Sequence, residues 1–153
     1  GGSGALWADP GNFFPGGAEG AADGRSTQRM RVFSDWVREW MGCVRLVVID
    51  RRGDSLLEGQ GAGFEGGGGP EQQQRALEAT VVTLARGWAD SRRRLRLVEP
   101  GGLVVSLGKE YRLFVVSCEN EEGLRAAAGL VTARTLSDGE LAVVREALER
   151  VMD

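Results

Sequence analysis

The 153-residue chain contains no histidine, and it therefore lacks the side chain that most often acts as a general base near neutral pH. It has only two cysteines, Cys43 and Cys118, too few for a disulfide scaffold, and two free buried thiols are expected. No apolar run approaches the roughly 18 residues that span a bilayer. No signal-peptide pattern opens the chain. These absences predict a cytoplasmic protein that is not an enzyme, with no catalytic, cofactor-binding or metal-binding residues.

A basic excess is also missing, because 19 basic and 22 acidic residues give a net charge of -3. Proteins that bind nucleic acids or anionic membranes usually carry such an excess, so neither partner is expected. The hydrophobic fraction of 42% and the charged fraction of 27% are typical of a globular domain with a core of its own.

The first 25 residues differ from the rest in composition. Residues 1–25 are rich in Gly, Ala and Pro and have no hydrophobic period, so we predict a flexible tail that begins with a Gly-Gly-Ser-Gly sequence typical of a linker. Residues 26–153 are predicted to form a single domain. Trp7, Phe13 and Phe14 are unusual in such a tail. They either pack loosely on the domain or form a docking peptide for a partner.

A tight turn is predicted after the first strand. Residues 44–50 are apolar at almost every position, which indicates a strand covered on both faces. Arg52-Gly53-Asp54 follows, and Gly53 can supply the positive φ that a hairpin turn needs before a second strand at residues 55–60. The tripeptide is also a cell-adhesion motif, but the chain shows no signal peptide and no disulfide framework. We therefore interpret it as a turn. The glycine-rich residues 59–70 are predicted to be a loop, because the Lys and Ser/Thr of a phosphate-binding loop are missing.

The remaining elements follow from periodicity. Apolar residues recur every three or four positions in four segments that predict helices, and three further runs predict strands. The predicted helices cover residues 29–41, 71–91, 120–134 and 137–153, and the three further strands cover residues 93–99, 103–107 and 111–118. The order is α-ββ-α-βββ-αα. It predicts an α/β (α+β) fold with a five-stranded antiparallel sheet sandwiched between helices, in the spatial order 2-1-5-4-3.

This order, with Asp50 and Gly53 in the hairpin and Ser-Leu-Leu-Glu-Gly after it, resembles the roadblock/LC7 family and its longin relatives, which are profilin-like domains. The resemblance covers about residues 30–153. It implies a non-enzymatic interaction module that forms homo- or heterodimers and binds or regulates a small GTPase, or that scaffolds a trafficking or motility complex. The last helix is also similar to that of GAF domains, which leaves a GAF- or PAS-like small-molecule sensing or dimerisation domain as an alternative. A third alternative is a secretion or complex chaperone that binds a partner's strand.

One basic segment is the predicted partner or dimer interface. Arg92, Arg93, Arg94 and Arg96 place four positive charges within five positions, close to Trp88, on the predicted edge strand 93–99 and directly after the helix before it. Charged residues protect strand edges from aggregation, which is one interpretation. Arg and Trp are also enriched at binding hot spots, and roadblock-like domains pair and dock through this helix and edge. We predict a partner surface here.

Overall fold

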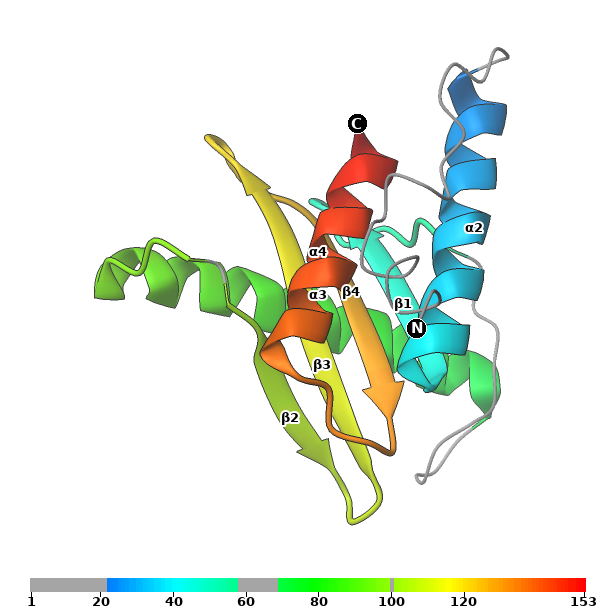
Figure 1. Ribbon diagram of the computed structural model, residues 1–153. Helices are drawn as coiled ribbons and strands as arrows, with labels where there is room; N and C mark the ends of the chain where they lie inside the picture. Colours follow the sequence, from blue (N-terminus) through cyan, green and yellow to red (C-terminus); the bar gives the residue numbers. More distant parts are fainter. Residues whose placement is uncertain (1–21, 58–68, 100) are drawn as a thin grey trace.

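The computed structural model describes residues 22–57, 69–99 and 101–153, and their side chains from residue 28 onward (Figure 1). These residues form three helices and one antiparallel sheet with the strand order β1-β4-β3-β2. The elements are α2 (Ala22–Met41), β1 (Cys43–Asp50), α3 (Pro70–Leu95), β2 (Leu103–Leu107), β3 (Tyr111–Asn120), β4 (Gly123–Thr132) and α4 (Asp138–Met152). The described part of the chain contains no helix that is both long enough and apolar enough to cross a membrane.

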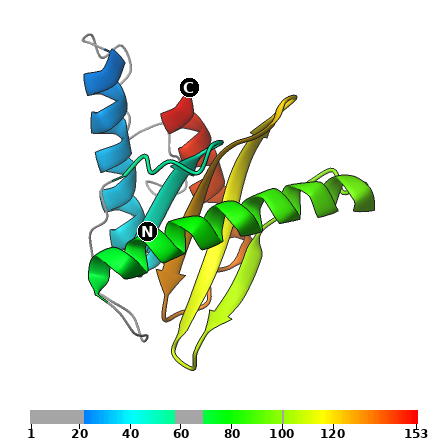
Figure 2. The same cartoon turned by 180° about the vertical axis from the view of Figure 1, so that it is seen from behind.

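The sheet is covered on both faces, by α2 and α4 on one side and by α3 on the other (Figures 1 and 2). Successive side chains of a strand point to opposite faces. Along β1, Leu46 and Val48 accordingly belong to the core under α2 and α4, whereas Val47 and Ile49 belong to the core under α3. This double burial explains why the strand is apolar at almost every position, as the sequence indicated.

The predicted helix at residues 120–134 is wrong, because most of this segment forms strand β4. It lies between β1 and β3 at the centre of the sheet, so β1 and β3 are not neighbours as the predicted order required. Its Ala126-Ala127-Ala128-Gly129 run has high intrinsic helix propensity at the alanines, but burial between two strands decides the outcome. The small side chains also let α3 approach closely: a Cβ atom on Gly129 would lie 2.4 Å from Val81 Cγ2.

The predicted strand at residues 93–99 is wrong. Helix α3 continues to Leu95 and ends at Arg96, which adopts the left-handed conformation with φ 58° and ψ 38°. The N–H of Leu97 donates to the carbonyl of Arg92 at 3.0 Å, and the N–H of Arg96 donates to that of Arg93 at 3.1 Å. These two bonds form a C-terminal helix cap, in which the left-handed position is usually occupied by glycine. Arg and Leu alternate in residues 94–97, which is typical of a strand, but these residues form the last turn of a helix and its exit.

The predicted hairpin after β1 is only partly described. Gly53 has φ 91°, which confirms the turn. The chain then returns along β1, with a bridge between Ile49 and Ser55 and a 2.8 Å hydrogen bond from the Leu56 N–H to the Val48 carbonyl. Residues 58–60 lie outside the described part. The described sheet therefore has four strands rather than five.

Helix α4 begins with a capping box. The Ser137 Oγ atom accepts a hydrogen bond from the Glu140 N–H at 3.1 Å, and Glu140 Oε1 accepts one from the Ser137 N–H at 2.9 Å. Arg134 also donates to the Glu140 carboxylate, and chiefly this bond lowers the pKa of Glu140. The cap fixes where the C-terminal helix begins on the sheet.

Candidate interaction site around helix α3

Helix α3 is longer than the sheet is wide. It spans 26 residues, crosses one face of the sheet, and its C-terminal end projects past the edge strand β2 (Figures 1 and 2). Its inward side consists of Gln74, Leu77, Val81, Ala85, Ala89 and Arg92, all buried. This inward side fixes the rotation of the helix on the sheet, so the residues on either side of it form two separate flanks.

Arg92, a predicted interface residue, belongs to the inward side. Its guanidinium pairs with the carboxylate of Glu119 on β3, and the two side chains are only 10% and 19% exposed. An arginine that is largely removed from water and paired in this way holds the end of the helix against the sheet.

One flank of α3 is apolar, and we call it the apolar flank: Leu84, Trp88 and Leu95. These residues are spaced i, i+4 and i+11, which places them on one side of a helix. Leu84 is half-buried and packs on the same core as Leu103 of β2. The end of α3 that carries Leu95 lies past the β2 edge, where the chain leaves the helix (Figure 1).

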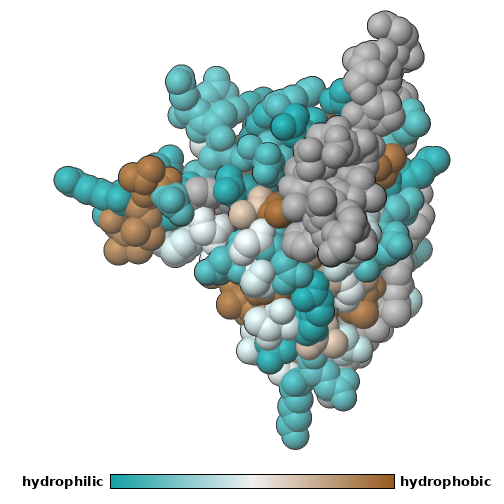
Figure 3. All heavy atoms as spheres, viewed as in Figure 1, coloured by the Kyte–Doolittle hydropathy of each residue, from teal (hydrophilic) through white to brown (hydrophobic). Residues whose placement is uncertain are grey.

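Exposed apolar side chains occur in and after the last turn of α3 and on β2. Among the described residues, the exposed large hydrophobics are Leu95, Leu97, Val98 and Val104, with exposed fractions of 63%, 47%, 93% and 55%. They fall within ten positions of the chain, and Figure 3 shows hydrophobic atoms on the projecting end of α3. In the described sheet β2 pairs with β3 alone, so its other edge is open. We call the apolar flank, the exposed Leu95, Leu97 and Val98 and the open β2 edge a candidate pairing face, or pairing face for short. Val104 points to the opposite face of the sheet from Leu103 and Val105, which pack under α3.

The opposite flank of α3 is basic. Arg86 and Arg93, seven residues apart, line a hollow of about 580 Å³ together with Arg51 and Arg52 from the turn after β1. We call this the basic hollow; its other lining residues are Ala89, Glu122, Gly123 and Leu124. Arg86 Nη2 donates to the Arg51 carbonyl at 2.6 Å and so joins the helix to the turn.

The turn beneath the basic hollow is internally braced. Asp50 Oδ1 accepts hydrogen bonds from the N–H groups of Arg52 at 2.9 Å and Asp54 at 3.0 Å. The carbonyl of Asp50 also accepts the N–H of Gly53 at 3.0 Å. The Arg-Gly-Asp sequence is thus a tight turn whose conformation depends on Asp50 and on the positive φ of Gly53.

The predicted interface residues are distributed around the helix instead of along one strand edge. Trp88 lies on the apolar flank, Arg92 faces the sheet, and Arg93 lines the basic hollow. Arg94 is exposed and pairs with Asp90 at 3.1 Å, and Arg96 forms the helix cap. A helix turns by about 100° per residue, whereas a strand alternates between two faces, so the wrong element type gave the wrong neighbours.

Sequence reasoning missed three of the arginines in the basic hollow. Arg51, Arg52 and Arg86 were not predicted as site residues, although all three line it. The spacing of seven between Arg86 and Arg93 is a helical repeat, and it becomes a signal once residues 70–95 are assigned to one helix. The tail residues predicted for docking, Trp7, Phe13 and Phe14, lie outside the described residues.

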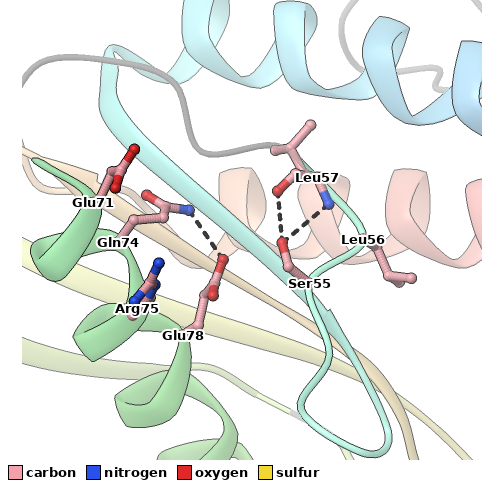
Figure 4. Close-up of a pocket in the computed structure, with 7 residues that line it drawn as sticks. All are labelled: Ser55, Leu56, Leu57, Glu71, Gln74, Arg75 and Glu78. Atoms are coloured by element: carbon pink, nitrogen blue, oxygen red, sulfur yellow. Dashed lines mark hydrogen bonds between the residues drawn. The ribbon is translucent and has the colours of Figure 1, made fainter.

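A second hollow, of about 530 Å³, lies between the start of α3 and the segment after the turn (Figure 4). Ser55 Oγ donates to the Leu57 carbonyl at 2.6 Å, and Gln74 Nε2 donates to Glu78 Oε2 at 3.4 Å. The serine hydroxyl is therefore bound to its own segment, and it is not arranged as a nucleophile.

The two cysteine thiols are not activated as nucleophiles. Cys43 and Cys118 are free and buried, as predicted. Burial raises the pKa of Cys43 to about 11 and that of Cys118 to about 12, so both are protonated near neutral pH. No group of three metal-ligating side chains occurs within the described ranges. The expectation that the chain is not an enzyme remains a prediction.

Solved structures match the chain, whereas no protein-family model and no curated protein does. The gliding protein MglB from Thermus thermophilus has 20% identity and a TM-score of 0.61, covering 90% of this chain and 96% of that one. Myxococcus xanthus MglB has 10% identity and a TM-score of 0.57, covering 88% of each chain. A Roadblock/LC7 domain from Streptomyces avermitilis, at 15% identity and a TM-score of 0.47, covers 72% of this chain and 79% of that one. The chain has a roadblock/LC7-like fold, which confirms the resemblance seen in the sequence.

Proposed function

We propose that this chain is a non-enzymatic interaction module that pairs with a second copy or a related chain and that binds or regulates a small GTPase. The observation that carries the proposal is the pairing face. It combines exposed large hydrophobics at the end of α3 with an open strand edge. Exposed apolar side chains and open edges are features that soluble proteins usually cover with a partner.

Pairing through this face explains both of its parts. Two β2 edges that meet would satisfy each other's backbone groups, and two copies of α3 would cover Leu95 and Val98. Trp88, Arg94 and Arg96 lie in or next to this face, so the proposal retains them as interface residues. Arg92 contributes by holding the end of the helix in place.

The GTPase half of the proposal rests on the fold. Roadblock domains bind small GTPases or build trafficking and motility complexes, and a gliding protein is among the structures with the same fold. The proposal places the chain in the cytoplasm, where such partners are found. A paired module would then act as a scaffold on which the GTPase is held.

The alternatives are less well supported by the described residues. A GAF- or PAS-like sensor needs an enclosed apolar pocket, but both hollows described above are lined mainly by charged and polar side chains. A chaperone that binds a partner's strand would use the same open β2 edge. It differs in stoichiometry, because one chain would then bind one extended peptide and would not pair with itself.

Sedimentation velocity tests the proposal. The chain alone should sediment with twice the monomer mass at micromolar concentration, and one of the small GTPases of the source organism should co-sediment when loaded with GTP or with GDP. The proposal would be refuted if the chain stays monomeric at all concentrations and binds no GTPase in either nucleotide state. A monomer that binds one extended peptide would indicate the chaperone.

Substitutions locate the pairing face in the same experiment. Leu95→Glu combined with Val98→Glu puts two carboxylates into the face and should leave the fold intact, because both side chains are exposed. Ala142→Glu, on the exposed side of α4, is the control. We expect the double variant to be monomeric and the control to pair like the unmodified chain.

A further inference from the structure

We propose that the basic hollow is a second binding site, which receives carboxylate side chains from an acidic partner protein. It is separate from the pairing face because it lies on the other flank of α3. This site rests on the proposed function in one respect, because the acidic partner protein would be bound by the paired module.

The charges of the hollow are unbalanced. Four arginines line it with a single carboxylate, Glu122, on a protein whose net charge is -3. Within the described residues, no carboxylate lies within salt-bridge distance of Arg52 or Arg86. Arg51 reaches Glu122 only at 3.8 Å and Arg93 reaches Asp90 at 3.7 Å, and both pairs are exposed. Exposed pairs of this kind are weak, so the hollow remains a local centre of positive charge.

The hollow is also preorganised. The bond from Arg86 to the Arg51 carbonyl fixes the turn against α3. Gly53 packs closely on the helix as well, because a Cβ atom there would lie 3.4 Å from Val82 Cγ2. Asp50 fixes the turn from within through its two backbone contacts. A ligand that binds here therefore does not have to order the turn first, and this lowers the cost of binding.

The chemistry favours carboxylates on a protein surface. Arginine binds carboxylates through two parallel hydrogen bonds, a geometry that fixes orientation as well as charge. Ala89, Gly123 and Leu124 give the hollow an uncharged lining between the arginines, which suits contact with another protein. A nucleic acid or an anionic membrane is a less suitable partner, because the chain has no basic excess.

The location has a structural consequence. Leu95 on the apolar flank and Arg93 in the hollow are two residues apart, and about 200° of helical rotation separates them. Two copies that pair through the apolar flank would keep both basic hollows open. The paired module would thus offer two equivalent sites for acidic partners.

An oligoglutamate peptide labelled with fluorescein is the probe for this site. Fluorescence anisotropy at low ionic strength should show binding to the unmodified full chain, with an affinity that falls as salt is added. Arg52→Glu with Arg86→Glu should weaken binding by about tenfold or more. Arg75→Glu with Arg150→Glu changes the net charge equally at exposed positions outside the hollow, and it should change the affinity by less than about twofold.

Several results would overturn the assignment. Equal losses in the two double variants would mean that only net charge matters, and no loss in either would mean that the peptide binds elsewhere. Inorganic phosphate and vesicles containing phosphatidylserine form the other arms. If they bind at the hollow and the peptide does not, the ligand is not a protein carboxylate.

Two further measurements keep the test informative. Arg52→Gln with Arg86→Gln replaces the first variant if Glu at these positions disturbs the turn, and circular dichroism checks the fold of each protein. Sedimentation of the same samples reports pairing. A hollow variant that still pairs but fails to bind the peptide supports this site. Peptide binding that survives the substitutions, with pairing intact, would overturn this inference alone and leave the proposed function standing.

Discussion

The two flanks of α3 differ in almost every property although the same 26 residues carry them. The apolar flank ends in side chains that are largely exposed to water and borders an open strand edge. The basic flank is hydrogen-bonded to a braced turn and lines a hollow with four arginines. Leu84 and Arg86 are only two residues apart, and about 200° of rotation puts them on opposite sides. One helix can therefore present two unlike surfaces, provided that its rotation on the sheet is fixed.

The contact between α3 and β4 fixes that rotation. Val81 packs onto the sheet where Gly129 has no side chain, and Ala85 continues the same buried row. Any change that lifts or turns the helix here should disturb both flanks at once. Substitutions at the contact between α3 and β4 should therefore impair both flanks, whereas a substitution on one flank tests that flank alone.

Gly129→Ala should have the largest effect. The new methyl group would lie 2.4 Å from Val81 Cγ2, and a buried valine has little freedom to move away. We expect a loss of about 2–3 kcal/mol in the free energy of unfolding, measured by urea denaturation. Both pairing and peptide binding should weaken, because both flanks depend on how α3 packs against β4 at Gly129.

Gly139→Ala is the matched control for that substitution. Gly139 lies in the first turn of α4, where a Cβ atom would meet only Ser137 Oγ at 3.9 Å. Alanine should leave stability unchanged or raise it by about 0.5 kcal/mol. If Gly129→Ala changes the free energy of unfolding as little as this control does, the close packing of α3 on β4 is wrong.

Arg92→Met should have the next largest effect, and Arg93→Met separates it from the basic flank. The first substitution leaves the carboxylate of Glu119, which is only 19% exposed, without its partner. We expect a loss of about 2 kcal/mol in unfolding free energy. The second removes an exposed pair with Asp90 and should cost less than about 0.5 kcal/mol. Equal costs would show that the two arginines do not have the different roles assigned here.

Arg96→Gly sharpens the description of the helix end and has the smallest expected effect. Arg96 is held at φ 58°, a conformation that glycine adopts without steric cost. Glycine should stabilise the protein by about 0.5–1 kcal/mol in thermal or urea unfolding. Arg94→Gly, two residues earlier and inside the helix, should destabilise it by about 0.5–1 kcal/mol. Destabilisation by Arg96→Gly would mean that the arginine side chain stabilises the cap more than its backbone strains it.

The sequence alone predicted helices and strands correctly where the periodicity of the apolar residues matches their burial in the structure. Strand β2 has the predicted bounds, and β1 and β3 differ from prediction by no more than two residues at an end. The buried sides of α2 and α4 followed from their apolar repeats. For α3 the repeat of Leu77, Val81, Leu84 and Trp88 was right only for the first two, because the buried row continues through Ala85 and Ala89. The turn at Gly53 followed from glycine chemistry, and its positive φ agrees. Local signals specify these elements because the tertiary environment supports the same choice.

The failures occurred where tertiary contacts override local preference. The alanines of β4 favour a helix in isolation, and only the neighbouring strands and the approach of α3 make small side chains necessary there. Residues 93–99 alternate like a strand but end a helix, because the pair between Arg92 and Glu119 holds that turn in place. The basic hollow joins a turn to a helix 35 positions later, and such a contact has no short-range signature.

The central claim is that the two flanks of α3 have separate tasks, and a crossed sedimentation and binding experiment tests it most directly. Leu95→Glu and Arg86→Glu each change one flank and would be compared with the unmodified chain for pairing and for binding of the oligoglutamate peptide. We predict that Leu95→Glu weakens pairing by about tenfold and leaves peptide binding intact, whereas Arg86→Glu does the reverse. If either substitution weakens both activities equally while the protein stays folded, the flanks form one surface and the account is contradicted.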